Sequence, residues 1–148
     1  MTVWLRYSAV FLAVAIGVAQ VVRLLGITKD EMLGSVAQIM VPAMIAALIE
    51  GQQYVRRTGM RPASGIAWRF GFAGMVVATL LNVALAFAGP EVAPEFAKLT
   101  IAAPGSQQFV TLLLMYAGGY LLANRVFFGI GAGNTLSRDR ARAERDGL

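Results

Sequence analysis

Two residue types that carry much of protein chemistry are missing from this chain of 148 residues, which has no cysteine and no histidine. Without cysteine it forms no disulfide and has no thiolate to attack a substrate or hold an iron–sulfur cluster. Without histidine it lacks the usual ligand of haem and transition metals, and the side chain that titrates near neutral pH. We therefore expect no metal ion and no cofactor.

Charge is also scarce, because 14% of the residues are charged and 57% are hydrophobic, whereas about a quarter are charged in a typical soluble domain. Four apolar stretches account for the difference, and each approaches the roughly 20 residues that an α-helix needs to cross a bilayer. They cover residues 4–25, 32–49, 68–88 and 109–133. The sequence predicts an all-α, polytopic membrane protein, in which residues 1–133 form an up-down bundle of four transmembrane helices.

Two details modify this predicted bundle. Pro42 lies in the middle of the second stretch, where a proline is expected to kink a membrane helix without ending it. Residues 134–148 are rich in charges of both signs. We expect them to form a solvated cytoplasmic tail that is helical for a turn or two at most.

The longest polar interruption, EGQQYVRRTGMRPASGIAWRFG at residues 50–71, carries Arg56, Arg57, Arg61 and Arg69. Cytoplasmic loops of membrane proteins have an excess of Lys and Arg. If the N-terminus is cytoplasmic, ten basic residues lie on that side and three on the other. We therefore predict a bacterial inner-membrane protein with both termini and this loop in the cytoplasm. The loop matches no nucleic-acid-binding module, so we expect it to attract anionic lipid and not nucleic acid.

Small residues let membrane helices approach closely, and they recur at four-residue spacing in three of the predicted spans. Two interpretations stay open: these faces pack the bundle internally, or they form a docking surface for a partner protein. The residues concerned are Ala9, Ala13 and Gly17 in the first span, Gly74 and Ala78 in the third, and Gly129 and Gly133 in the fourth.

Uncharged polar residues inside the spans are further candidates for a site. In the predicted topology, Gln20, Gln38 and Asn82 lie toward the outer half of the membrane. Either they line a shallow, outward-facing pocket for a headgroup, a quinone or a small solute, or their amides hydrogen-bond between helices. A second polar face, predicted to point inward from the fourth helix, consists of Tyr116, Tyr120 and Asn124.

The centre of each predicted span has no acidic or basic residue, so a proton-coupled pump would have no titratable group within the membrane. Paired carboxylates, a nucleophile beside a base, and clusters of metal ligands are missing as well. The least ordinary acid is Glu50, at the inner end of the second span, where Arg57 and Arg125 are the expected ion-pair partners. These features predict a protein that is not an enzyme.

The stretch EGQQYVRRTGMRPASGIAWRFG resembles a family of small bacterial inner-membrane proteins of similar length and no established function. The resemblance lies in a Gly and an aromatic at a polar helix end, then basic residues, Gly, Arg and Pro, and an aromatic–Arg pair that opens the third span. ANRVFFGIGAG, at residues 123–133, and the basic tail after it are similar to the fourth span of that family. The resemblance implies an inner-membrane bundle of four helices and no particular activity.

Small-residue faces, short loops and missing catalytic groups favour a non-catalytic integral inner-membrane protein that acts as an accessory or assembly subunit of a larger membrane complex. Its partners would be membrane lipids and other membrane-protein subunits, or further copies of the chain. The alternative is a small transport component, or a membrane protein that binds a lipid, quinone or solute in the outward-facing polar pocket. An enzyme acting on lipid is the third hypothesis, and no residue stands out as its base or nucleophile.

Overall fold

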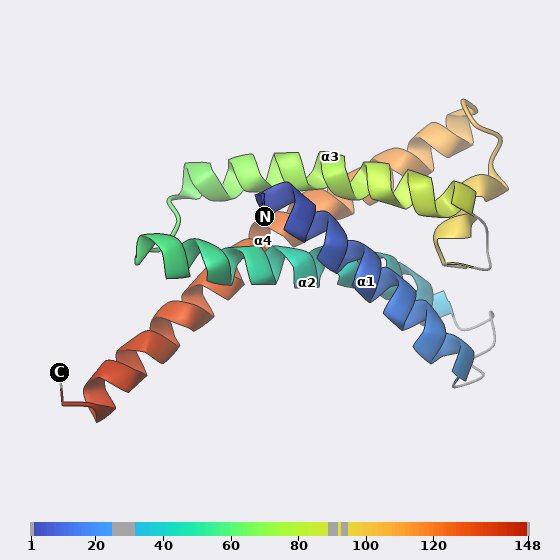
Figure 1. Ribbon diagram of the computed structural model, residues 1–148. Helices are drawn as coiled ribbons and strands as arrows, with labels where there is room; N and C mark the ends of the chain where they lie inside the picture. The colour runs from blue at the N-terminus through green and yellow to red at the C-terminus, as the bar shows by residue number, and fades with distance from the viewer. Residues whose placement is uncertain (1, 25–31, 89–91, 93–94, 148) are drawn as a thin grey trace.

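The computed structural model describes residues 2–24, 32–88, 92 and 95–147, with side chains at all of these except 22, 23 and 32–38. Within these residues the chain forms four long α-helices and one short 3₁₀ helix, and no strand (Figure 1). The predicted all-α fold class is therefore confirmed. The elements are α1 (Val3–Leu24), α2 (Met32–Thr58), α3 (Ser64–Ala88), η1 (Phe96–Ile101) and α4 (Gln107–Arg145).

Three helices in this described part are long and apolar enough to cross a membrane, one fewer than predicted. They are α1 over Val3–Val21, α3 and α4. The described part of α2 does not meet the prediction of a fourth span at residues 32–49. This helix runs on to Thr58, so its second half carries Glu50, two glutamines and two arginines. The side chains of its apolar first turns, at residues 32–38, lie outside the described part.

The surface of the bundle is apolar in the manner of a membrane protein. A soluble monomer rarely exposes large contiguous apolar patches, whereas lipid-facing side chains are apolar by necessity. On α1, α3 and α4, large hydrophobic side chains that are more than half exposed include Leu5, Phe72, Val76, Leu80, Leu114, Met115 and Leu122. Together with the three long apolar helices, they indicate that the chain is a membrane protein.

A tight turn joins α2 to α3 and makes them a helical hairpin (Figure 1). Beyond Thr58, Gly59 has a positive φ of 66°, and its N–H donates to the carbonyl of Val55 at 2.7 Å. A left-handed residue after the last turn is a common way to end a helix, and glycine adopts that conformation without strain. The next helix begins at Ser64, where the carbonyl of Ala63 accepts the first hydrogen bonds.

The fourth long helix, α4, has 39 residues, which corresponds to about 58 Å at 1.5 Å per residue. Its start is capped by Ser106, whose side-chain oxygen accepts the N–H of Phe109 at 3.1 Å. The expectation of a largely unstructured tail at residues 134–148 is wrong, because the helix continues to Arg145. Arg, Ala and Glu are good helix formers, and an established helix propagates easily through them. Figure 1 shows this exposed segment projecting beyond the other helices.

Two glycines fix the point at which α2 and α4 cross. A Cβ atom added at Gly51 of α2 would overlap the backbone carbonyl of Phe128, and one added at Gly131 of α4 would overlap the carbonyl of Leu48. The two backbones are therefore in direct contact, which a larger residue at either position would prevent. The α2–α4 pair also makes the most extensive contact between any two helices of the described chain.

Two of the predicted small-residue faces lie away from the neighbouring helices. Ala9, Ala13 and Gly17 of α1 are all exposed, and a Cβ added at Gly129 or Gly133 of α4 would meet nothing within 4 Å. Within the described chain these faces do not pack the bundle internally, and the docking interpretation stays a prediction. The face that packs lies two positions away along each helix, which is a rotation of about 200°. The residues that pack are Gly131 in α4, together with Tyr7, Phe11, Ala15 and Ala19 in α1.

Candidate functional site

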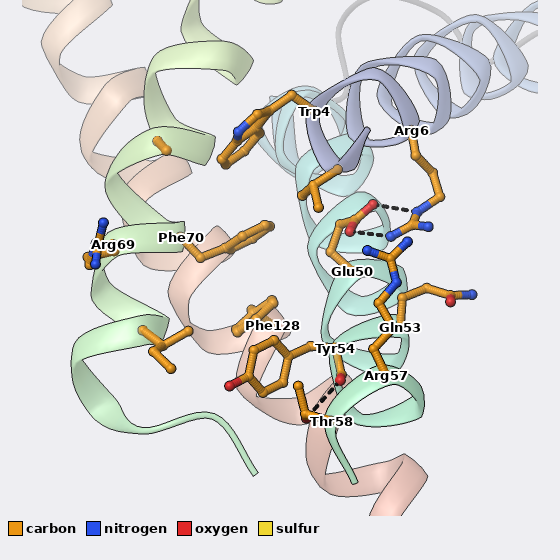
Figure 2. Close-up of a pocket in the computed structure, with 13 residues that line it drawn as sticks. Trp4, Arg6, Glu50, Gln53, Tyr54, Arg57, Thr58, Arg69, Phe70 and Phe128 are labelled. Carbon is orange, nitrogen blue, oxygen red and sulfur yellow. Dashed lines mark hydrogen bonds and ion pairs between the residues drawn. The ribbon is translucent and has the colours of Figure 1, made fainter. Parts of the chain in front are cut away.

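A cavity of about 420 Å³ opens at the end of the bundle that holds the first turn of α1 and the α2–α3 turn. Residues from all four long helices line it. Figure 2 shows aromatic rings along one side of the cavity and charged groups along the other. Such a division suits a molecule with an apolar part and a polar part.

The aromatic side consists of one ring from each long helix, which we call the aromatic column: Trp4 of α1, Phe70 of α3, Phe128 of α4 and Tyr54 of α2. Trp4 stacks on Phe70 with ring centroids 5.5 Å apart, and Phe70 stacks on Phe128 at 4.3 Å. Tyr54 meets Phe128 edge-on at 5.8 Å. Aromatic pairs of this kind each contribute about 0.5–1.5 kcal/mol beyond their buried area, so the column ties the four helices together here.

The charged side is built around an ion pair between α1 and α2. The Nε of Arg6 donates to Oε1 of Glu50 at 2.6 Å, and its Nη2 donates to Oε2 at 2.5 Å. This bidentate arrangement offsets the cost of burying the Glu50 carboxylate, which is only 3% exposed. The sequence-based choice of Arg57 or Arg125 as its partner is therefore corrected. Arg125 instead lies over the ring of Trp68, 4.4 Å from the centroid.

A second guanidinium reaches the same side of the cavity. Arg57 extends from α2 toward the Arg6–Glu50 pair in Figure 2, and no acid of the described chain lies within 4.0 Å of it. Arg69 also borders the cavity, but its guanidinium points away from it. The charged side therefore carries two guanidinium groups and one carboxylate, an excess of one positive charge.

The predicted polar face of α4 points into the core beside this cavity. Asn124 and Tyr120 are fully buried, and Asn124 links three helices. Its Oδ1 accepts the hydroxyl of Tyr7 at 2.6 Å, and its Nδ2 donates to the carbonyl of Tyr120 at 2.8 Å. Gly74 of α3 makes room for the amide, since an added Cβ would lie 2.9 Å from the Cγ of Asn124. Ala78, one turn on, is buried as well.

Two of the three residues predicted to line the outward-facing polar pocket have described side chains, and the surroundings of these two differ. Gln20 is exposed on the surface of α1, whereas Asn82 is buried in α3. The amide atoms of Asn82 have no hydrogen-bond partner among the described residues. The side chain of Gln38 lies outside the described part. The cavity lies at the basic end of the bundle, beside the last turn of α2, which carries Arg56, and the α2–α3 turn, which carries Arg61.

Sequence reasoning missed the aromatic column because its four rings come from four separate helices and share no spacing. The ion pair had a detectable signal, because Glu50 is the one acid that borders a predicted span on the side of the membrane where Arg6 and other arginines border the spans. Such charges require a partner when helices bury them. As for metals, no group of three or more acids lies close enough to hold an ion in the described part.

The sequence matches no protein-family model, and comparisons with curated proteins and with solved structures find no match. The resemblance in the α2–α3 loop therefore stays a prediction. In the site itself, an apolar aromatic wall faces two guanidinium groups and a carboxylate that is held in an ion pair.

Proposed function

We propose that the protein is a non-catalytic integral membrane protein that binds a lipid-like amphiphile in the cavity at its basic end. One observation carries this proposal: the cavity places the aromatic column opposite the Arg6, Glu50 and Arg57 side chains. The position is also apt, because positively charged loops favour the cytoplasmic face of an inner membrane, where anionic headgroups gather.

The proposed binding site differs in position from the polar pocket that the sequence predicts. The expected pocket faced outward around Gln20, Gln38 and Asn82, whereas the cavity borders the loop that we predict to be cytoplasmic. A membrane-embedded helix bundle commonly builds ligand sites between its helices. An opening near the headgroup region lets a lipid enter sideways without crossing the bilayer.

Native mass spectrometry of the protein, purified in a mild detergent, tests this function. We expect one amphiphile to remain bound per chain. Ala73 lines the cavity, so Ala73→Phe should fill it and remove the bound molecule. Ala84 lies on the same helix but is exposed, so Ala84→Phe adds the same ring without touching the cavity.

Either of two results would count against amphiphile binding. The first is a wild-type protein that carries no amphiphile under conditions where it stays folded. The second is an equal loss of the amphiphile in both phenylalanine variants, because that would reflect a general effect on the bundle. If Ala73→Phe does not fold, Ala73→Leu provides a smaller filling of the same space.

A second candidate function is an accessory or assembly subunit of a larger membrane complex. The exposed face of Ala9, Ala13 and Gly17 favours it, because all three residues are exposed and a Cβ added at Gly17 would meet nothing within 4 Å. A membrane partner could approach this face closely. Purification at native abundance with partner identification tests this function. Recovery of a lone monomer or homodimer would remove it, and a partner that is lost in Gly17→Leu would support it.

A further inference from the structure

The charges of the cavity define the kind of amphiphile that fits. Arg6 holds Glu50 in a bidentate ion pair, so the single carboxylate of the cavity is already neutralised. Arg57 has no acid of the described chain within 4.0 Å, yet its guanidinium lies beside this pair (Figure 2). An anionic ligand would complete its coordination, because a guanidinium binds carboxylate or phosphate through two parallel hydrogen bonds.

The apolar part of the cavity lining offers few hydrogen-bond partners to a polar ligand. Val3, Ile66 and Ala73 belong to the cavity lining and add apolar side chains to those of the aromatic column. A sugar or a nucleotide would leave its hydroxyl or ring polar atoms without partners against these side chains. A hydrocarbon chain meets no such penalty.

We propose that the ligand is an anionic amphiphile whose phosphate or carboxylate head binds Arg57 while its hydrocarbon tail lies against the aromatic column. This inference rests on the proposed binding function and specifies its ligand class. Arg6 stays paired with Glu50 and keeps the head from meeting a bare carboxylate. Arg56, on the same turn of α2 as Arg57, does not line the cavity and takes no part.

Tryptophan fluorescence gives a direct test, since the chain has two tryptophans and one of them borders the cavity. In a Trp68→Phe background, Trp4 reports alone. The protein is reconstituted with phospholipids that carry bromine on one acyl chain, which quenches a nearby indole. Brominated phosphatidylglycerol supplies an anionic head, and brominated phosphatidylcholine supplies a zwitterionic one. Only the part of the quenching that Ala73→Phe removes is assigned to the cavity, because Trp4 is 37% exposed and also meets surrounding lipid.

We expect this cavity-dependent quenching to favour phosphatidylglycerol by about fivefold, the preference that one cation near the surface supplies. Arg57→Gln should abolish the preference. Arg56→Gln removes an equal charge from the same turn. Both arginines are exposed, but only Arg57 lines the cavity, so we expect Arg56→Gln to change the preference by less than about twofold. Inorganic phosphate has the head without the tail and should leave the quenching unchanged.

The outcomes separate this inference from the function on which it rests. Equal cavity-dependent quenching by both lipids would overturn the anionic ligand but keep amphiphile binding. Quenching that Ala73→Phe does not affect, for either lipid, would overturn amphiphile binding itself. An equal effect of Arg56→Gln and Arg57→Gln would show that loop charge, and not a site at Arg57, sets the preference. Full displacement by inorganic phosphate would show a free-anion site and overturn the two-part ligand.

Discussion

Among the described residues, Glu50 is the most deeply buried charged side chain, at 3% exposed, and it is paired with Arg6. Removing one partner of a buried ion pair leaves an uncompensated charge and costs about 3–5 kcal/mol. Arg6 is 19% exposed, so water offsets part of this cost. We expect Arg6→Leu to lower the free energy of unfolding by about 2–3 kcal/mol, measured by reversible unfolding in detergent micelles.

A double variant separates the charge of this ion pair from its packing. Arg6→Leu combined with Glu50→Leu removes both charges, and we expect it to recover at least about half of the lost stability. Arg56→Leu, at an exposed arginine of the same end, should change stability by no more than about 0.5 kcal/mol. If the double variant were as unstable as Arg6→Leu alone, the pair would act through packing and not through charge.

The hydroxyl of Tyr7 provides a smaller, local test of the buried polar contacts. It donates to Asn124 at 2.6 Å in the core. Tyr7→Phe removes this donor with little change of shape, and hydrogen bonds between membrane helices contribute about 0.6–2 kcal/mol. We therefore expect a loss of about 1 kcal/mol in the same unfolding measurement. Tyr116→Phe is the matched control at a half-buried tyrosine, and a loss of equal size there would contradict the assignment.

At the scale of the helices, the α2–α4 crossing depends on which glycine faces the partner backbone. Gly131 contacts the backbone of Leu48, whereas Gly129, on the same helix, has open space around it. Gly131→Ala must push the helices apart, and overpacking of this kind costs about 1–3 kcal/mol. Gly129→Ala should instead be neutral or stabilise the helix by up to about 1 kcal/mol, because alanine has the higher helix propensity.

These two variants carry the same substitution at positions two residues apart on one helix. Thermal unfolding of both in one detergent compares them directly, and we expect only Gly131→Ala to lower the midpoint. A lower midpoint for Gly129→Ala would place that glycine at a contact that the isolated chain does not show, such as an interface with a second protein.

The positions of the helices were predictable, and their mutual faces were less so. Each predicted span lies on a helix of the structure, because the length and apolar character of a run can be read from consecutive residues alone. The face that packs depends on how the helices cross, and small residues at four-residue spacing occur on more than one face of α1 and α4. Tyr7 and Phe11 occupy the packed face of α1, while Ala9 and Ala13 do not.

The candidate site was predictable only in part for the same reason. The basic loop and the unusual position of Glu50 could be read from the sequence, because charges at the end of a span need partners. The choice of Arg6 over Arg57 or Arg125 is decided by where the first turn of α1 crosses α2. No local pattern encodes that crossing, and none brings Trp4 onto Phe70.

At the scale of the whole molecule, the cavity and the basic loop lie at one end of the bundle, and the α3–α4 connection lies at the other (Figure 1). A ligand in the cavity touches all four long helices through the aromatic column. Occupancy would therefore stabilise the bundle as a unit, in the way that any ligand specific to the folded state does. Because the cavity lies at one end of the bundle, the orientation of the bundle in the membrane determines from which side a ligand enters.

The absence of cysteine from the sequence allows this orientation to be measured with single substitutions. Met60, in the α2–α3 turn, is 66% exposed, and Ala103, between η1 and α4, is also exposed. The 25 residues of α3 lie between them and extend about 37 Å, more than the roughly 30 Å hydrocarbon core. We expect an impermeant maleimide added outside intact cells to label Ala103→Cys and to label Met60→Cys only after permeabilisation, as the excess of arginine around Met60 requires. Reversed labelling would place the cavity on the outer face, while labelling of both variants from outside would show that α3 does not span the membrane.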